Sequence, residues 1–548
     1  MISSILIPTV ATLLASVACY ALKVWYTNWT SPLRFIDGPP CANPFLGHFA
    51  LVFDVPDITD KWREKYGPTF MAKGIFGEDD LHTMDVKAVS HILSHGAIYQ
   101  KPYAVLSALR VILGEGILSV EQDPHKRQVT WMLHYSPAFG PQQLRLMNEV
   151  FVEKAISELC DMLAKEVDIA GGQLTANISD WFRQLTLDII GEAGFGYHFN
   201  SLKSGGKDEA ELSTVFARLL NDPNVNFNAA FRAAQVAIPV LRALPLPGWT
   251  VTRYANKKLH AIGRELLHKS KAECAALGSN DLGSGRDLLS ILVKANMSSD
   301  VPASQRMSDA EVIAQIPTFF LAGHETSSLA LAWAVHALSH NQTVQDKLRQ
   351  ELLSLSTDTP TMDELDAFPF LENVLRETMR LYAPAVSAQR AAMADDVLPL
   401  DKLYVDRNGV KHDTLPIRKG QVCTISILAI NTSKELWGED ALEFRPDRWN
   451  NLPEAVHAIP GVWAHQLTFL AGPHSCMGFR FTIVEQKAIL FGLLRNFVFF
   501  PASDEVKPAI STTFQRPISY VSGSAEAGLV STGGLRITIR SYKGGVHA

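Results

Sequence analysis

The sequence predicts a mainly α-helical protein with a minor β portion, and three observations lead to this expectation. First, apolar residues recur at helical spacing through long segments, which are residues 141–165, 173–196, 308–339, 363–382 and 479–496. Second, strand signals are few and lie at residues 69–75, 80–84 and 397–430, where Asn408-Gly409 is typical of a hairpin turn. Third, 47% hydrophobic and 19% charged residues among 548 are ordinary values for a globular protein.

The N-terminal segment predicts a membrane anchor over residues 1–24. Residues 2–22 carry no charge, and roughly 20 apolar residues are enough for a helix to cross a bilayer. Lys23 ends the apolar run, and Trp25, Tyr26 and Trp29 follow it as side chains typical of a membrane interface. Because basic residues follow the segment and none precedes it, we expect a single-pass protein with its body in the cytosol.

Residues 25–48 are rich in proline and glycine and predict a stiff spacer, so the body is expected over residues 49–548 as one domain. The net charge is −6 and no long basic block occurs, which argues against nucleic acid as a partner. Six cysteines are scattered without zinc-ligand spacing, which indicates a reducing compartment.

The first half of the body predicts a helix over residues 86–95 and irregular chain over residues 96–120. Polar, glycine-rich loops are expected at residues 201–208 and 278–287. Between them, residues 227–247 are apolar and interrupted by prolines. This segment is expected to be either a core helix or an exposed segment that touches a membrane or covers a substrate entrance.

The helix over residues 308–339 begins at a capping box, Ser308-x-x-Glu311, and contains a polar interruption. Glu325 and Thr326 lie within apolar sequence, where a charged side chain is costly unless it has a partner. The small residues Ala322 and Gly323 precede them and leave room on one face. The interruption is either a functional acid–alcohol pair or a hinge with a satisfied polar patch.

Two further motifs lie toward the C-terminus. Glu377 and Arg380 are three residues apart on one helix, a spacing that usually gives a weak surface ion pair. Cys476 lies between Gly472 and Gly478 in a tight loop that leads into the helix over residues 479–496. A helix N-terminus favours a thiolate, which suits a metal ligand; a buried structural cysteine is the alternative.

In their order and spacing, these motifs resemble the cytochrome P450 monooxygenases, specifically the membrane-anchored fungal type, over about residues 30–520. The resemblance implies the cytochrome P450 fold, with haem between the long central helix and the helix after the cysteine loop. The loop is similar to the family's haem-binding loop, in which Cys476 would be the axial thiolate and His474 stands where arginine is usual. The other matching loop residues are Phe469, Gly472 and Gly478.

The resemblance also gives roles to the other motifs. Ala322, Gly323, Glu325 and Thr326 match the oxygen-activation motif, in which the acid and the alcohol would deliver protons to O2 and Gly323 would leave space over the iron. Glu377 and Arg380 match the E-x-x-R motif, whose third partner would be Arg445 or Arg448. The haem propionates would be held by cationic or hydrogen-bonding side chains: Arg390, His474, His125, and Arg127 or Lys126.

The function implied is that of a haem b monooxygenase of the endoplasmic reticulum membrane, acting on a lipophilic, terpenoid-like molecule. Electrons would come from NADPH through a separate NADPH–cytochrome P450 reductase, with cytochrome b5 as a further donor. Candidate pocket walls are residues 100–118, 221–248 and 385–388, with Phe319 and Phe320. The alternatives are a reductase-independent haem-thiolate isomerase or dehydratase, and a membrane-tethered haem or sterol binder without enzymatic activity.

Overall fold

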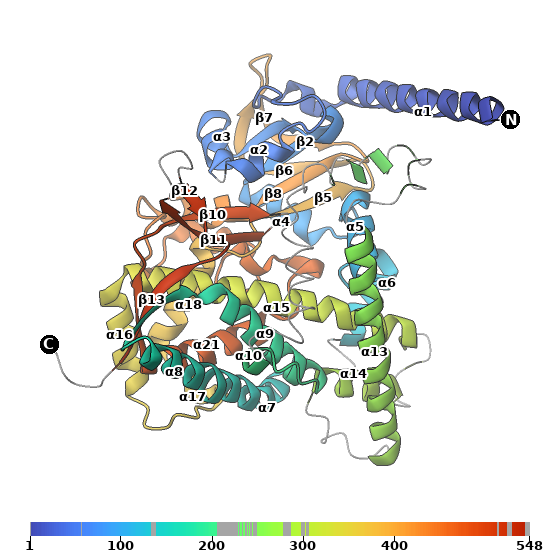
Figure 1. Ribbon diagram of the computed structural model, residues 1–548. Helices are drawn as coiled ribbons and strands as arrows, with labels where there is room; N and C mark the ends of the chain where they lie inside the picture. Colours follow the sequence, from blue (N-terminus) through green and yellow to red (C-terminus); the bar gives the residue numbers. More distant parts are fainter. Residues whose placement is uncertain are drawn as a thin grey trace.

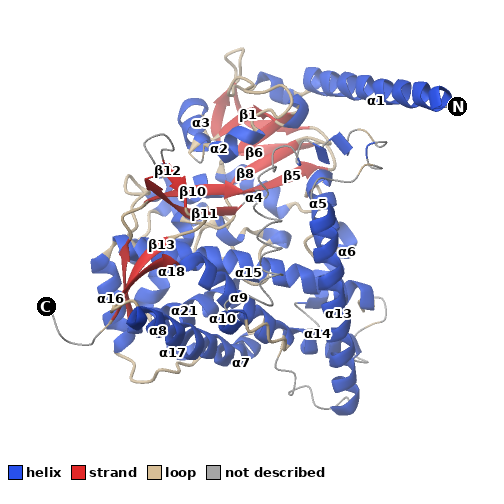
Figure 2. Cartoon of the chain, viewed as in Figure 1, coloured by secondary structure: helices blue, strands red, loops and turns tan. Residues whose placement is uncertain are grey.

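A helix-rich half and a smaller β-rich half share the described part of the chain in the computed structural model (Figure 1; Figure 2). The structure describes all residues except 1, 56, 133–138, most of 205–248, 278–286, 298–301, 303–305, 512–513, 523–528 and 543–548. The predicted mainly α-helical fold with a minor β portion is confirmed. The segment at residues 227–247 and the loop at 278–287 lie largely outside the described residues.

The N-terminal helix α1 (Ile2–Thr30) projects from the β-rich half as a single rod (Figure 1). It continues through the first six residues of the expected spacer, because no proline occurs between residue 25 and Pro32. Near its end it touches the body: Tyr20 Oη donates to Glu78 at 2.8 Å, and Asn28 Nδ2 donates to Gly77 O at 2.7 Å. The expected anchor at residues 1–24 therefore includes Tyr20, a residue that hydrogen-bonds to the body. Within the described residues, no helix has both the length and the apolar character needed to cross a bilayer.

A five-stranded sheet organises the β-rich half. Its strand order is β1-β2-β8-β5-β3, and only β2 and β8 pair in parallel. The strands are β1 (Thr69–Lys73), β2 (Asp79–Thr83), β3 (Tyr99–Gln100), β5 (Ser387–Ala392) and β8 (Val422–Ser426). The hairpin β6 (Asp396–Val405) and β7 (Lys411–Ile417) turns at the predicted Asn408-Gly409. The helices of this half are α2 (Phe49–Asp54), α3 (Ile58–Tyr66) and α4 (Val86–Ser94).

Two expectations for these segments are wrong. Residues 96–120 are not wholly irregular, because α5 (Tyr103–Leu113) begins after Pro102 and ends at Gly114, whose φ is +70°. The strand expected through residue 430 ends at Ser426, and the short helix α19 (Ile427–Asn431) follows directly.

The helical half is built around α15 (Asp309–His340), which the capping box at Ser308 and Glu311 starts as predicted. It packs most extensively against α9 (Ile178–Phe195), and α21 (Phe479–Asn496) also touches it. The remaining helices are α6 (Gln122–Thr130), α7 (Pro141–Val152), α8 (Asp161–Ile169), α10 (Ser201–Ser204), α13 (Trp249–Leu277), α14 (Leu288–Met297), α16 (Gln342–Leu353), α17 (Met362–Asp366), α18 (Pro369–Leu381) and α20 (Lys434–Trp437).

Three predicted helices are subdivided. A π-helical stretch, Glu153–Cys160, joins α7 to α8, and residues 173–177 form strand β4 (Gln173–Asn177) before α9. Asn177 then caps α9 through its side chain. The helix expected over 363–382 breaks before Pro369 into α17 and α18.

Two small sheets complete the fold. One has the order β4-β13-β9, with β9 (Phe497–Pro501) and β13 (Arg536–Ser541). The other has the order β10-β11-β12, with β10 (Glu505–Ser511), β11 (Phe514–Ser522) and β12 (Leu529–Ser531). Trp333 Nε1 of α15 donates to Gln515 O of β11 at 3.3 Å, which holds this strand against the central helix.

Candidate active site

The cysteine loop has a tightly constrained backbone. The Cys476 N–H donates to Phe469 O at 2.9 Å, which closes the loop just before α21. Gly472 has a φ of +69°, and a Cβ atom there would lie 2.1 Å from Leu93 O of α4. Glycine is therefore required for both conformation and space. Phe469 packs edge-on against Trp463, with ring centroids 5.6 Å apart.

The Cys476 side chain is accessible. Burial nevertheless raises the pKa of its thiol to about 11, although the Gly478 N–H opposes this shift by hydrogen-bonding the sulfur. The loop and helix start alone therefore do not make a thiolate, contrary to the expectation from the helix N-terminus. A bound metal ion would lower the pKa of this accessible thiol and favour its thiolate.

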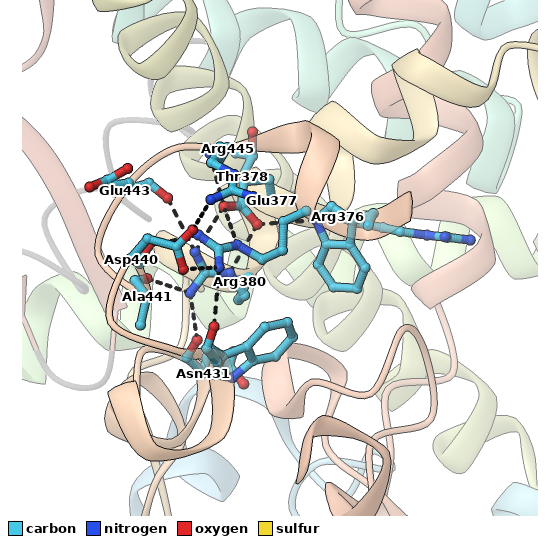
Figure 3. A network of polar contacts seen from close by, with 12 residues as sticks. Arg376, Glu377, Thr378, Arg380, Asn431, Asp440, Ala441, Glu443 and Arg445 are labelled. Carbon is cyan, nitrogen blue, oxygen red and sulfur yellow. Dashed lines mark hydrogen bonds and ion pairs between the residues drawn. The ribbon is translucent and has the colours of Figure 1, made fainter. Parts of the chain in front are cut away.

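Glu377 and Arg380 form a fully buried pair on α18 (Figure 3). Arg380 donates to the two Glu377 carboxylate oxygens from Nε at 2.9 Å and from Nη2 at 2.8 Å. The surface-pair alternative is therefore wrong. Arg380 Nη1 also donates to Asn431 O at 2.9 Å and Ala441 O at 2.6 Å, which fixes the chain after α19.

The third partner of this pair is Arg448. Its Nε donates to Glu377 Oε1 at 3.1 Å, and its Nη1 donates to Asp440 Oδ1 at 2.6 Å. Arg445 contributes its backbone N–H to Glu377 Oε1 at 3.0 Å, while its side chain is exposed and pairs with Asp440 (Figure 3). Sequence spacing alone did not show which of these two arginines is the third partner of the Glu377–Arg380 pair.

The network reaches the cysteine loop through Asn431, which sequence reasoning missed. Asn431 Oδ1 accepts from the Leu467 N–H at 2.9 Å, and its Nδ2 donates to Thr468 Oγ1 at 2.9 Å. Thr468 Oγ1 in turn donates to Met379 O of α18 at 2.7 Å. The chain that enters the loop is thus tied to the same helix that carries Glu377.

Beside the loop lies a second buried group, the loop-edge cluster, made of Lys101, Glu121, His125, Arg390 and His474. Glu121 joins it: Lys101 Nζ lies 2.8 Å from its Oε1, and His474 Nε2 lies 3.1 Å from its Oε2. The rings of His125 and His474 lie 4.1 Å apart. Of the predicted propionate ligands, His125, Arg390 and His474 are therefore brought together, whereas Lys101 and Glu121 were not foreseen.

The electrostatics of the loop-edge cluster favour a bound anion. Burial lowers the pKa of His125 to about 4 and also lowers the pKa of His474, so both rings lose their protons more readily than free histidine. Burial alone would raise the pKa of Glu121, but the hydrogen bond from His474 and the charge of Lys101 outweigh it, and the pKa falls to about 2. Two cations, Lys101 and Arg390, thus face one carboxylate.

Arg127 does not join this cluster. Its guanidinium pairs with Glu311 in the first turn of α15. Glu311 lies fourteen residues before Glu325, or about 21 Å along the helix at 1.5 Å per residue. The structure therefore does not bring Arg127 together with the other predicted propionate ligands, because its charge is engaged by Glu311.

The acid–alcohol pair lies midway along α15. Thr326 Oγ1 donates to Ala322 O at 2.6 Å, and the buried Glu325 lies 3.3 Å from Arg516 Nη2 of β11. Burial lowers the pKa of Arg516, which Glu325 partly restores. The costly buried carboxylate thus has its partner, from a strand nearly 200 residues away that the sequence did not connect to it.

Gly323 differs from expectation. A Cβ atom at this position would lie 3.0 Å from Ile190 Cδ1 of α9. Its lack of a side chain therefore permits close packing of α15 against α9. Phe320 also faces α9, with its ring 4.5 Å from that of Phe195, and is a core residue rather than a pocket wall.

Comparisons with known proteins agree with these observations. The family model for cytochrome P450 matches residues 37–521. Cytochrome P450 monooxygenase 205 of Postia placenta is 43% identical over 517 residues, covering 92% of this chain and 94% of that relative. Cytochrome P450 monooxygenase 128 of the same fungus is 42% identical over 497 residues, covering 89% and 90%. The ganoderic acid synthetase of Ganoderma lucidum is 31% identical over 506 residues, covering 86% and 88%.

Proposed function

Because the chain belongs to the cytochrome P450 family of haem-thiolate monooxygenases, we propose that it inserts one atom of O2 into a lipophilic, terpenoid-like molecule, with electrons from NADPH through a separate reductase. The observation that carries this proposal is the accessible Cys476 thiol beside the loop-edge cluster. The family's cofactor is haem b, which supplies one-electron and O2 chemistry when bound.

The residues present fit this cofactor. Cys476 would ligate the iron, whose positive charge offsets the raised pKa of the thiol. Arg390 is buried and, within the described residues, its guanidinium makes one hydrogen bond, to Gln389 O at 2.8 Å, so donors remain for a carboxylate. We assign the propionates to Arg390 and Lys101, with His125 and His474 as neutral neighbours. Phe469, Gly472 and Gly478 would shape the loop around the sulfur.

Proton delivery would use the acid–alcohol pair. Glu325, held by Arg516, would take up protons and pass them through water toward Thr326 Oγ1. Thr326 Oγ1 donates to Ala322 O, so its lone pairs can accept a hydrogen bond from water, and the hydroxyl would have to turn away from Ala322 O to donate its proton toward O2. Ala322 would therefore orient the hydroxyl through its backbone, whereas Gly323 sets the helix packing.

The proposed substrate class rests on the relatives of this chain, and the proposed membrane contact rests on the exposed side chains of α1. A ganoderic acid synthetase among the relatives supports a biosynthetic substrate. The exposed side chains Leu14, Leu22, Trp25 and Trp29 on α1 support membrane contact, so we place the catalytic body on the cytosolic side of the endoplasmic reticulum. Since the sequence contains no flavin or NADPH fingerprint, the reductase is a separate protein, with cytochrome b5 as a further donor.

The test is spectroscopic and then catalytic. Reduced protein with CO should show the absorption band of thiolate-ligated haem, and Cys476→Ala should lose it, whereas Cys423→Ala, which replaces a buried cysteine of β8, should keep it. Persistence of the band without Cys476 would exclude the assigned ligand. With a reductase and a terpenoid panel, turnover should require NADPH; turnover of a hydroperoxide without NADPH would instead support the isomerase or dehydratase.

A second test concerns the relay. Thr326→Ala should consume NADPH without matching product and should release peroxide, because its hydroxyl no longer supplies the proton. Unchanged coupling between NADPH use and product formation would contradict the role of this hydroxyl.

A further inference from the structure

Two neighbouring side chains of α21 hold one residue of α15. Ser327 Oγ donates to Glu485 Oε2 at 2.6 Å, and Gln486 Nε2 donates to Ser327 O at 3.1 Å. All three residues are completely buried. Ser327 directly follows Thr326, and Glu485 lies nine residues after Cys476. The helix that carries the acid–alcohol pair and the helix that starts at the cysteine loop are therefore joined at one polar point.

This carboxyl differs from the two other buried acids described above. Glu325 has Arg516 and Glu377 has Arg380 and Arg448, whereas within the described part of the chain Glu485 forms no ion pair. Its Oε1 has no hydrogen-bond partner among the described residues. Burial raises the pKa of Glu485 to about 8, and the bond from Ser327 only partly opposes this. At neutral pH it is therefore an uncharged acid, and its contact with Ser327 is a neutral, directional hydrogen bond.

We propose that the Ser327–Glu485 hydrogen bond, backed by Gln486, is a joint that fixes the separation of α15 and α21 and so sets how firmly the haem is held between them. This inference rests on the proposed function, because it assumes a haem ligated by Cys476. On α15, Thr326 of the acid–alcohol pair directly precedes Ser327. On the other side of the joint, Cys476 lies nine residues before Glu485 of α21. Since packed helices are stiff, a shift of α15 relative to α21 at this hydrogen bond would move Thr326 relative to Cys476, and the haem would lie between these two residues. Ser327 and Glu485 are thus positioning residues.

The experiment measures haem release from the full-length holoprotein to excess apomyoglobin. Ser327→Ala and Glu485→Leu should each release haem about tenfold faster, because each breaks a buried hydrogen bond and the first leaves an acid without its donor. Glu485→Gln should stay within about threefold of the unmodified protein, since the amide oxygen still accepts from Ser327. The Ser327→Ala/Glu485→Leu double variant should be no faster than the faster single variant.

Ser339→Ala is the matched control, because Ser339 is a buried serine of the same helix whose hydroxyl donates within the helix, to His336 O at 2.7 Å. It should release haem at the unmodified rate. The joint is overturned if Ser327→Ala also releases haem at that rate, if Glu485→Gln behaves like Glu485→Leu, or if the two changes add. Thermal unfolding of the haem-free variants shows whether a change in haem release reflects a less stable fold. If Glu485→Gln and Glu485→Leu are equally stable without haem, slow haem release in the glutamine variant alone supports the joint.

The outcome is separable from that of the proposed function. If the unmodified protein shows no thiolate-type CO band, the ligand assignment fails before any variant is compared. If that band is present and the variants release haem normally, the joint alone is wrong.

Discussion

Two buried charge groups flank the cysteine loop, and they differ in whether their charges cancel. In the network around Glu377, the two arginines Arg380 and Arg448 face two carboxylates, Glu377 and Asp440. In the loop-edge cluster, Lys101 and Arg390 face one carboxylate of the described part of the chain, Glu121. The buried arginines of the first group are balanced by carboxylates, and the further arginine that pairs with Asp440, Arg445, is exposed to solvent. The second group keeps one buried positive charge in excess among the described residues.

The hydrogen bonds differ in the same way. Arg380 uses Nε, Nη1 and Nη2 on partners that belong to the chain, and Trp449 Nε1 also donates to Glu377, at 3.1 Å. Arg390 makes one guanidinium hydrogen bond within the described residues. A balanced and satisfied group holds structure, while an unbalanced and partly satisfied group is suited to an anionic ligand. The cost of burying the excess charge is then offset only when the ligand arrives.

The largest effect should come from Glu377→Ala. Removal of this carboxylate leaves Arg380 and Arg448 buried without their counter-ion, which should lower the free energy of unfolding by about 3–5 kcal/mol. Thermal or urea unfolding of the haem-free protein measures it. Arg145→Ala is the control, because its pair with Asp363 is exposed and should contribute less than about 1 kcal/mol. Equal losses for the two variants would remove the distinction between this network and a surface pair.

Arg390→Gln should have the opposite profile. It removes a buried cation that lacks a full set of partners, so the haem-free protein should keep its stability within about 1 kcal/mol. Haem release to apomyoglobin should become at least about tenfold faster, because a charge-assisted bond to a propionate is lost. If Arg390→Gln instead unfolds the apoprotein as Glu377→Ala does, the loop-edge cluster is structural.

Glu121→Gln should separate stability from haem retention. The pKa of Glu121 is lowered from 4.5 to about 2, so its carboxylate stabilises the fold above pH 4.5 and loses this contribution as the pH falls from 4.5 toward 2. At pH 7 the glutamine variant should be less stable without haem by about 1–3 kcal/mol, and the difference should vanish near pH 2. Haem release should be slower, because the competing carboxylate is gone. Faster release would show that Glu121 supports the cofactor.

The smallest effect should come from Arg445→Ala. Its contribution to Glu377 is a backbone N–H, which alanine retains, and its exposed side chain pairs only with Asp440. The loss of stability should stay below about 1 kcal/mol, whereas Arg448→Ala should approach the effect of Glu377→Ala. Side-by-side urea unfolding of the two variants decides whether Arg448 alone is the third partner.

Much of the central framework could be predicted from sequence because its signals are local. The capping box at Ser308 located the start of α15, and helical spacing placed Glu377 and Arg380 on one face. The loop-edge cluster was only half predicted, since Lys101 and Glu121 come from a segment without periodicity and meet His474 only in the folded chain. Arg516 was missed for the same reason, because nothing in the sequence around this strand residue indicates that it pairs with Glu325 of a distant helix.

Other differences came from competing local forces. At the Cys476 thiol, burial raises the pKa more strongly than the one hydrogen bond from the Gly478 N–H lowers it. Gly323 was expected to open space, but the direction of its missing side chain depends on which helix packs there, and that helix is α9. Neither the depth of burial nor the facing element can be read from neighbouring residues alone.

The contact between Gly472 and Leu93 has a consequence for biosynthesis. The cysteine loop leaves the ribosome late, yet it closes against α4 and against Lys101, which is 373 residues earlier in the chain than His474. Contacts between such distant residues form slowly, because a long intervening chain must be ordered first. The contacts that close the cysteine loop can therefore form only after both of these distant segments have been made, which makes them late contacts in the folding of this chain.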